Sequence, residues 1–435
     1  MLTKLKSLQN HSGFMRYFKN TSWLLGEKIL RMVVGLFVGI WVARYLGPEQ
    51  FGLFSYAQSF VGLFTAIATL GLDGIVVREL VKVETRRDEL IGTAFWLKFI
   101  GAFGVLLFLA IAINFTSNDT QTNILIFIIA SATVFQAFNV VDFYFQSKVL
   151  SKYIVYANVI SLFFSSVVKI ALILSVAPLV AFAWVVLFDS FVLACGFVYF
   201  YIKNHQIDWK FNKVIAVDLL RDSWPLIISS MSFVIFSNID NIMIKELLNE
   251  YYVGIYTAAY KLVTLWYFLP GLVLNSLFPS IVGVYGNKNL FHKRILMIST
   301  LLVWAAIFIF IIYQLFANKI IDVTYGEEYF ESGELLNLLG FVNILIFYNS
   351  IWNQWMIIEN KTKRILFFHV FTALFNIVFN YFLIEIYGVI GAVYSLLLSL
   401  SCSYLIFGFY DRRVLKLFIS SIIFEILWKK NEKNI

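Results

Sequence analysis

The chain has 435 residues, of which 60% are hydrophobic and only 14% charged, and its mean hydropathy is +0.82. This balance excludes an ordinary soluble domain and makes the lipid bilayer the solvent for most of the chain. The net charge of +8 therefore does not by itself indicate nucleic-acid binding, and two cysteines inside apolar runs do not form a disulfide framework. We predict an all-α integral membrane protein.

Apolar segments long enough to cross a membrane follow one another along the whole chain. The first two flank a Gly-Pro turn, which predicts a transmembrane hairpin within residues 20–77. Twelve spans are predicted in all: 20–44, 51–77, 91–114, 123–146, 153–176, 179–202, 223–247, 252–279, 293–316, 333–357, 364–386 and 388–410.

Basic residues predict the orientation of these spans. The two termini and the connections on their side carry 26 lysines and arginines, whereas the connections on the other side carry three. Because basic residues stay in the cytoplasm, both termini are predicted to be cytoplasmic. The predicted organisation is an N-lobe of six helices (1–203), a cytoplasmic linker (204–222), a C-lobe of six helices (223–410) and a basic cytoplasmic tail with an interfacial helix (411–435).

An internal repeat supports two lobes. A shift of 202 positions brings Ile40, Leu46, Gly52, Ala57 and Val61 onto identical residues, which are Ile242, Leu248, Gly254, Ala259 and Val263. The matches fall on equivalent turns, that between spans 1 and 2 and that between spans 7 and 8. Because six spans separate them, both halves enter the membrane from the same side. This is a parallel repeat, as expected for an alternating-access transporter.

Several cations lie at membrane depth, where an ionisable group costs at least about 2.5–3.5 kcal/mol and so needs a reason. Arg31 lies near the middle of the first span with Lys28 on the same helical face, and Lys261 reaches the middle of the eighth. Lys169 lies high in the fifth span. We predict that these four cations line a watery cavity between the lobes that accepts an anion such as a phosphate or diphosphate, the alternative being structural ion pairs.

Other polar residues within the spans suggest two further predictions. Asp240 with Asn376 and Asn380 offers one carboxylate and amide oxygens, which suit Na⁺ or a proton, the alternative being interhelical hydrogen bonding. Lys98, Lys245 and Glu385, near helix ends, are expected to snorkel towards the headgroups.

Motif searches for catalysis give nothing. The chain contains no HExxH, no CxxC, no Walker loop and no nucleophile elbow, and its four histidines are scattered. We therefore predict a protein that is not an enzyme and has no metal site and no cofactor beyond Na⁺ or H⁺ coupling.

Particular stretches resemble a known family. ARYLGPEQFGLFSYAQSFVGLF followed by LGLDGIVVREL resembles the polysaccharide transporter family, and within it the Wzx-type O-antigen flippases. SWPLIISS (223–230) and NIVFNYFLIEIYGVIGAVYS (376–395) extend the likeness into the second half. These flippases belong to the MOP superfamily, with MATE drug exporters and lipid II flippases.

The resemblance implies a V-shaped fold and flipping of an undecaprenyl-diphosphate-linked oligosaccharide across the bacterial inner membrane. It assigns the cationic cavity to Arg31, Lys28 and Lys261, with Lys169, and a cation site to Asp240, Asn376 and Asn380. Asn380 is neutral where some relatives have a carboxylate, which leaves cation coupling open. The implied partners are the lipid-linked oligosaccharide, membrane lipids, and the polysaccharide polymerase and chain-length machinery.

Three alternatives remain. A multidrug exporter of the same fold would present an acidic or apolar cavity to organic cations. A membrane oligosaccharide polymerase or ligase would need a large outer loop, and the predicted outer connections are short. A major-facilitator permease would carry a Gly-Asp-Arg-rich turn between its second and third spans, where this chain has ELVKVETRRDEL.

Overall fold

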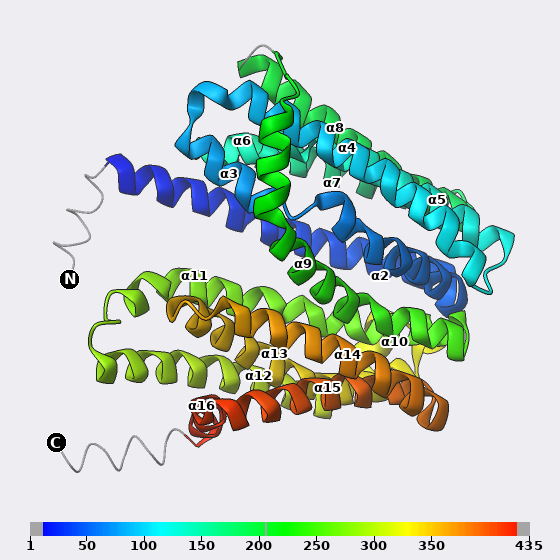
Figure 1. Cartoon of the computed structure of the whole chain (residues 1–435). Coiled ribbons are helices and arrows are strands. Elements are labelled where there is room, and N and C mark those ends of the chain that lie inside the picture. The colour runs from blue at the N-terminus through cyan, green and yellow to red at the C-terminus, as the bar shows by residue number, and fades with distance from the viewer. Residues whose placement is uncertain (1–11, 205–206, 424–435) are drawn as a thin grey trace. The chain divides into compact units, whose positions relative to one another are not determined.

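The computed structural model describes residues 12–204 and 207–423, and throughout these ranges the ordered elements are helical (Figure 1). The helices are α2 (Ser12–Thr69), α3 (Asp73–Lys82), η1 (Glu84–Arg86), α4 (Arg87–Ala112), η2 (Ile113–Phe115), α5 (Thr120–Gln136), η3 (Ala137–Asn139), α6 (Val140–Ser147), α7 (Ser151–Leu174), α8 (Leu179–Asn204), α9 (Lys213–Leu247), α10 (Glu250–Thr264), η4 (Leu265–Tyr267), α11 (Phe268–Val282), α12 (Lys288–Thr324), η5 (Glu327–Tyr329), α13 (Ser332–Ile358), α14 (Thr362–Tyr387), α15 (Val389–Tyr410) and α16 (Arg412–Ile422).

Eleven segments of the described chain are long and apolar enough to cross a membrane, which confirms a multi-pass membrane protein. The first of them, Asn20–Thr65, is 46 residues long and holds residues of both spans of the predicted first hairpin. Helical geometry within it is interrupted at Gly47 (φ 70°, ψ 169°), which is followed by Pro48. The count of twelve spans and the cytoplasmic placement of the termini stay predictions.

Three predicted spans contain breaks at positions that the sequence analysis did not give. The span at 51–77 is broken after Thr69, because Leu70 and Gly71 have positive φ, and α3 starts at Asp73. A 3-10 turn, η3, separates α5 from α6 in the middle of the span at 123–146, and η4 similarly separates α10 from α11. Gly71 suits a left-handed position because it has no Cβ.

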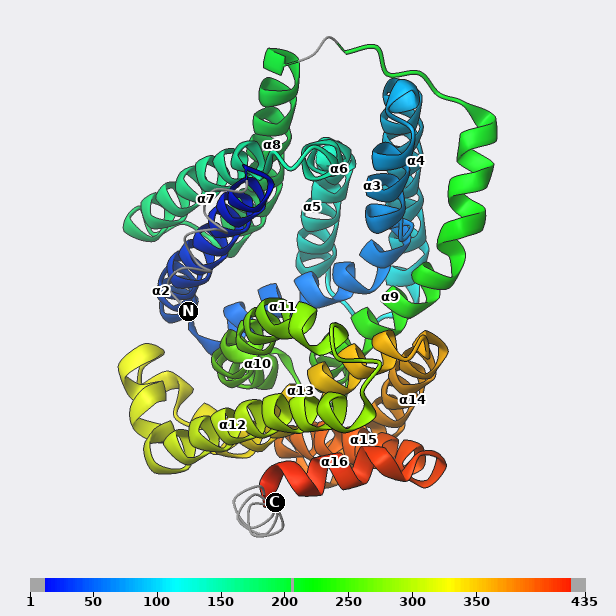
Figure 2. The ribbon, with the colours of Figure 1, turned by 90° about the vertical axis from the view of Figure 1, so that its left-hand side faces the viewer.

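The chain divides into two compact units. The first comprises the described residues up to Leu46 together with Tyr56–Val234. Within it, α7 and α8 run side by side (Figures 1 and 2). A buried apolar cluster joins α3, α4, α6, α8 and the start of α9, and includes the fully buried Phe145 and Tyr201.

The second unit comprises Gly47–Ser55 and the described residues from Ile235 onward. Its most extensive helix pairs are α12 with α13 and α14 with α15. On α15, Ser395, Ser399 and Ser403 recur every fourth residue and are fully buried, which lets α14 approach closely. The Thr372 hydroxyl of α14 donates to the Ser403 hydroxyl at 2.7 Å.

The segment Gly47–Ser55 packs on the start of α10 and on η5. A Cβ added to Gly52 would lie 1.8 Å from the carbonyl oxygen of Glu250, and one added to Gly254 would lie 2.0 Å from the carbonyl oxygen of Pro48. Backbone therefore meets backbone here, which only glycine allows. The Phe51 ring also contacts the ring of Tyr329, with centroids 6.3 Å apart.

An ion-pair network joins the ends of α13, α14, α15 and α16 in the second unit. The Arg413 guanidinium donates to both Glu359 oxygens, at 3.0 and 3.2 Å, and to Asp411 at 2.7 Å. Arg364 donates to Asp411 at 2.8 Å. Hydrogen bonds from Arg413 and Arg364 lower the pKa of Asp411 to about 2. Burial acts most strongly on the pKa of Glu359 and raises it, but hydrogen bonds from Lys361, Arg413 and Trp355 outweigh it and the pKa is lowered.

The amphipathic helix α16 is anchored to the same unit. Val414 and Ser421 are buried, the Tyr348 hydroxyl donates to the Val414 carbonyl at 2.5 Å, and Ser421 donates to Ser299 at 2.6 Å. α16 therefore packs on α12 and α15. The rest of the predicted tail, residues 424–435, lies outside the described residues.

Candidate functional site

Two of the predicted anion-binding cations lie on α2 in the first unit. The Arg31 guanidinium donates through Nε to Glu27 at 2.8 Å, one helical turn earlier. The Arg31 side chain is nevertheless 43% exposed, whereas that of Glu27 is 11% exposed. Lys28 is exposed. The ion pair with Glu27 therefore orients Arg31 and lowers the cost of its charge, while much of the side chain stays accessible.

Lys169 lies on α7 and is half-buried. Asp189 of the neighbouring α8 interacts with it electrostatically, and the same carboxylate accepts a hydrogen bond from Ser161 at 2.6 Å. This arrangement gives Lys169 a structural counter-charge within the first unit. It makes Lys169 the predicted cation whose role is explained most simply by internal pairing.

Lys261 lies on α10 in the second unit and is half-buried. Its ammonium lies 4.5 Å from the centroid of the Phe51 ring, in the segment Gly47–Ser55. A cation over an aromatic face is stabilised by the ring quadrupole. The Phe51 ring therefore lowers the cost of the Lys261 charge at membrane depth, as an anion-binding role requires.

These cations belong to two units, each of which is described by itself. Lys28, Arg31 and Lys169 lie in the first, and Lys261 lies in the second. The cavity that would bring them together between the lobes stays a prediction. Within the first unit, α2 carries Lys28 and Arg31 together.

The predicted cation site is assembled inside the second unit. Asp240 of α9 is 5% exposed, and Asn376 and Asn380 of α14 are fully buried. The Asn380 amide donates to Asp240 Oδ1 at 2.7 Å, and the Tyr256 hydroxyl donates to Asp240 Oδ2 at 2.6 Å. Asn376 lies beside the same carboxylate. The structure thus brings together all three residues that the sequence analysis grouped here.

This cluster has unused oxygens. Among the described residues, the side-chain oxygens of Asn376 and Asn380 are buried without a hydrogen-bond partner. A buried polar atom without a partner is costly and calls for an explanation. Amide and carboxylate oxygens are the ligands that a hard cation prefers, so the donor set fits an alkali cation.

Sequence reasoning missed Tyr256. Its ring stacks on that of Tyr260, with centroids 5.5 Å apart, and its hydroxyl holds the Asp240 carboxylate. The repeat contained a signal, because a shift of 202 places Tyr256 on Phe54, so the hydroxyl is the feature that the second copy adds. No motif marks a lone hydroxyl on an apolar helix.

The snorkelling prediction for Lys98 and Lys245 is wrong. The side chain of Lys98 is 6% exposed and its ammonium pairs with Asp73 at 2.9 Å. The side chain of Lys245 is 7% exposed and lies 3.5 Å from Glu246. Both ammonium groups find carboxylates inside their own units, which costs less than stretching to the headgroups. In the part of the chain that the structure describes, no group of three or more His, Cys, Asp or Glu side chains could hold a metal ion.

Comparisons with known proteins agree with these features. The profile of the family described as "Polysaccharide biosynthesis protein" matches residues 17–284, and that of the MatE family matches residues 225–382. A "Putative O-antigen transporter" of Shigella flexneri is 22% identical over 88% of this chain and 94% of its own length. The protein of the same description from Shigella dysenteriae is 23% identical over 63% of this chain and 69% of its own.

Solved structures share the fold. An inward-facing multidrug resistance MATE family transporter of the MOP superfamily aligns with a TM-score of 0.70 at 17% identity, over 89% of this chain and 95% of that one. The lipid II flippase MurJ, in an inward closed conformation, aligns with a TM-score of 0.67 at 14% identity, over 91% and 90%. With a family match over more than half of its length, the chain belongs to the polysaccharide biosynthesis protein family.

Proposed function

We propose that the protein is a flippase that moves an oligosaccharide linked to a polyprenyl diphosphate from the inner to the outer leaflet of the bacterial cytoplasmic membrane. The family match and the resemblance to O-antigen transporters support the substrate class. Arg31 is the residue that supports this function most directly. It is a cation at membrane depth whose side chain is 43% exposed despite its ion pair with Glu27.

In this proposal the cations neutralise the diphosphate. Arg31 and Lys28 act from α2, and Lys261 acts from α10, where Phe51 holds its charge in place. Lys169 contributes less to neutralising the diphosphate, because the Asp189 carboxylate already compensates its charge. The sugars occupy the hydrated interior, and the polyprenyl chain stays in lipid. Alternating access then exposes the headgroup to the outer face.

Asp240, Asn376, Asn380 and Tyr256 form the proposed coupling site. Oxygens of the first three would hold Na⁺, and the Tyr256 hydroxyl and the Asn380 amide would orient the carboxylate. The bound ion supplies the energy of its gradient when it binds from one side and leaves on the other. The unpartnered oxygens of Asn376 and Asn380 support this assignment.

The test is polysaccharide export in cells that carry Arg31→Ala, Lys28→Ala or Lys261→Ala. Loss of a charge-assisted contact to phosphate removes about 1.5–3 kcal/mol, so each change should cut transport roughly tenfold or more. Lys319→Ala is the matched control, because Lys319 is 73% exposed and pairs with Asp322. Full export by both Arg31→Ala and Lys261→Ala, at equal protein level, contradicts the proposed role.

A multidrug exporter is the second candidate, and the MatE match over residues 225–382 favours it. An exporter of organic cations would confer drug resistance without changing the cell-surface polysaccharide. The flippase proposal expects the opposite result in a deletion strain.

A further inference from the structure

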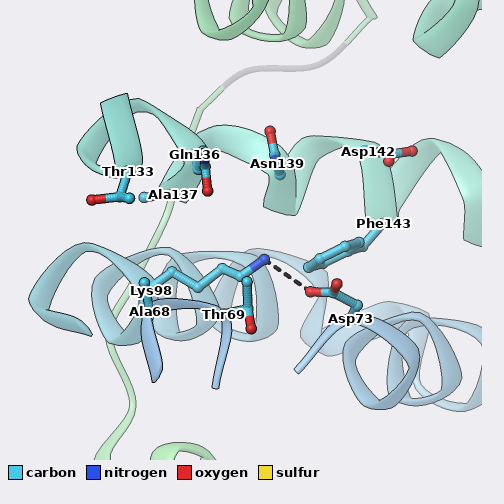
Figure 3. A pocket seen from close by; sticks show the side chains of 10 residues that line it. All are labelled: Ala68, Thr69, Asp73, Lys98, Thr133, Gln136, Ala137, Asn139, Asp142 and Phe143. Carbon is cyan, nitrogen blue, oxygen red and sulfur yellow. Dashed lines mark hydrogen bonds and ion pairs between the residues drawn. The ribbon is translucent and has the colours of Figure 1, made fainter. Parts of the chain in front are cut away.

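A polar pocket of about 120 Å³ lies inside the first unit, apart from the residues discussed above (Figure 3). Two helix breaks line it. The break between α2 and α3 contributes Thr69 and Asp73, and the region around the 3-10 turn between α5 and α6 contributes Gln136, Asn139 and Asp142. Segments that are about 70 residues apart along the chain thus interrupt their helices at the same place.

Two helix interruptions that line one pocket are informative in a membrane protein. Backbone that leaves helical geometry at membrane depth is tolerated only where protein buries it or where it lines a water-filled cavity. Transporters place ion sites at interrupted helices for this reason. The pocket is polar and has room for several water molecules. Its geometry therefore points to a hydrated site.

Lys98 of α4 supplies a cation built into this pocket. Its ammonium donates to Asp73 Oδ1 at 2.9 Å and lies 4.4 Å from the centroid of the Phe143 ring (Figure 3). The Asp73 side chain is 61% exposed, whereas that of Lys98 is 6% exposed. The pocket thus runs from the surface of the unit to a buried ammonium whose charge Asp73 compensates.

Asp142 is the second carboxylate of the pocket, and Lys98 does not pair with it because it already pairs with Asp73. Its Oδ1 accepts a hydrogen bond from the Gln146 amide at 3.0 Å, which is a neutral donor. Counting the pocket residues, one ammonium faces two carboxylates, so one negative charge has no cation within the pocket. Because Asp142 is partly buried, a proton or a cation from solution would lower the cost of this charge. The Lys98 ammonium occupies the position beside Asp73 where a metal cation would bind, and its charge repels a metal cation elsewhere in the pocket. A proton on Asp142 is therefore the better counter-charge.

The groups that surround Asp142 support a single titrating carboxyl. Its strongest electrostatic neighbours on other elements are Asp73, Lys98 and Glu27. Asp73 is paired with Lys98, and Glu27 with Arg31. Ring contacts on α6 come from two phenols, Tyr153 of α7 on Phe145 and Tyr201 of α8 on Tyr144, and phenols are neutral near pH 7. Arg87 of α4 lies over the Tyr144 ring, 5.8 Å from its centroid.

We propose that this pocket is a proton-binding site of the first unit. Asp142 takes up one proton from water that enters at Asp73 and becomes a neutral carboxylic acid. The Lys98–Asp73 pair keeps metal cations out. Glu27 interacts electrostatically with Asp142 and accepts a hydrogen bond from Arg31. Protonation of Asp142 therefore changes the electrostatic potential at the proposed headgroup site. This last step alone rests on the proposed function.

The test is infrared difference spectroscopy of the purified full chain in lipid nanodiscs, recorded while the pH is lowered from about 9 to about 5.5, a range in which solvent-exposed carboxyls stay ionised. The wild type should gain the C=O band of a protonated carboxylic acid, and Asp142→Asn should lose the part that corresponds to one carboxyl. Asp208→Asn, a surface carboxyl paired with Lys210, should keep it. Lys98→Gln should gain the band at higher pH than the wild type, because the pocket then holds two unopposed carboxylates.

Two results would overturn the proposal. One is an undiminished band in Asp142→Asn. The other is loss of the wild-type band when Na⁺ replaces choline at constant pH, since a metal ion then competes for the site. If Asp142→Asn does not fold, Asp142→Glu serves instead, and a band with unchanged frequency and midpoint contradicts the assignment. No substrate is present in this measurement, so its failure leaves the flippase proposal untouched.

Discussion

Gly52 and Gly254 occupy equivalent positions of the internal repeat, and each packs against the backbone of the turn that contains the other. Gly52 lies against the backbone of Glu250, and Gly254 lies against the backbone of Pro48. The shift of 202 that superposes the two glycines also superposes Pro48 on Glu250. A reciprocal pair of contacts of this kind is the product of a local twofold relation, like that of an isologous interface. The two turns are thus complementary to each other.

This contact predicts a severe effect of small substitutions. Gly52→Ala or Gly254→Ala would place a methyl group about 2 Å from a carbonyl oxygen, where only movement of backbone relieves the clash. We expect each variant to lose thermal stability in detergent by several degrees or to fail to accumulate. Size-exclusion chromatography after heating measures this. Gly104→Ala is the control, because a Cβ at Gly104 meets nothing within 4 Å. Equal melting of Gly52→Ala and Gly104→Ala would show that the turn is not closely packed.

The cluster around Asp240 predicts sodium binding by the purified protein. Asp240→Asn and Asn376→Ala should lose binding of radioactive sodium and the rise in melting temperature that a bound ion gives, since a ligand stabilises the state that binds it. Tyr256→Phe should weaken binding less, because it removes only a hydrogen bond to the carboxylate. Asp322→Asn, whose side chain is 48% exposed, is the control. Wild-type protein that melts identically in Na⁺ and choline does not bind sodium there.

Lys261 and Phe51 should be energetically coupled. A cation over an aromatic ring at 4.5 Å contributes about 0.5–1 kcal/mol at a partly exposed site. Phe51→Leu keeps an apolar side chain but removes the ring face. In a double-mutant cycle, Phe51→Leu and Lys261→Met should therefore be non-additive by about that amount in the free energy of unfolding. Strict additivity would mean that the ring does not hold the ammonium.

Asp411 predicts the acid sensitivity of the second unit. Its pKa falls from 3.8 to about 2 because Arg413 and Arg364 donate to the carboxylate. A carboxyl with a lowered pKa stabilises the fold fully above its unfolded value, and this stabilisation is lost as the pH falls through the folded value. We expect a contribution of about 2 kcal/mol that disappears between about pH 4 and pH 2. Asp411→Asn should melt earlier at neutral pH and show a flatter acid limb. Asp208→Asn should match the wild type.

The sequence predicted the membrane helices well because the bilayer leaves few other structures open to an apolar chain. Hydropathy located the spans, and the Gly-Pro pair located the irregular point at Gly47. The interruption at Ala137–Asn139 was missed because those residues carry no strong break signal. Tertiary packing, not local propensity, makes a helix change to a 3-10 turn there.

Contacts within the candidate site could be predicted where the two residues lie close together in the sequence or where the family resemblance groups them. Glu27 could have been paired with Arg31 from the spacing of four on one helix. Asp240 and Asn380 are 140 residues apart, so their polar chemistry within apolar spans and the resemblance grouped them, whereas spacing along the chain could not. The break at Leu70 and Gly71, which puts Asp73 at the start of α3, was not foreseen. Nearness to a helix end therefore suggested snorkelling for Lys98, whereas its ammonium pairs with Asp73.

The nine residues Gly47–Ser55 come from the N-terminal half of the chain but belong to the second unit. Neither half of the coding sequence therefore specifies a complete lobe. A chimera between two such transporters, joined in the connection after α8, would combine one parent's C-terminal helices with the other parent's version of this segment. Swaps that transfer residues 47–55 together with everything after Val234 would keep the glycine contact intact, and they mark the true module boundary for engineering.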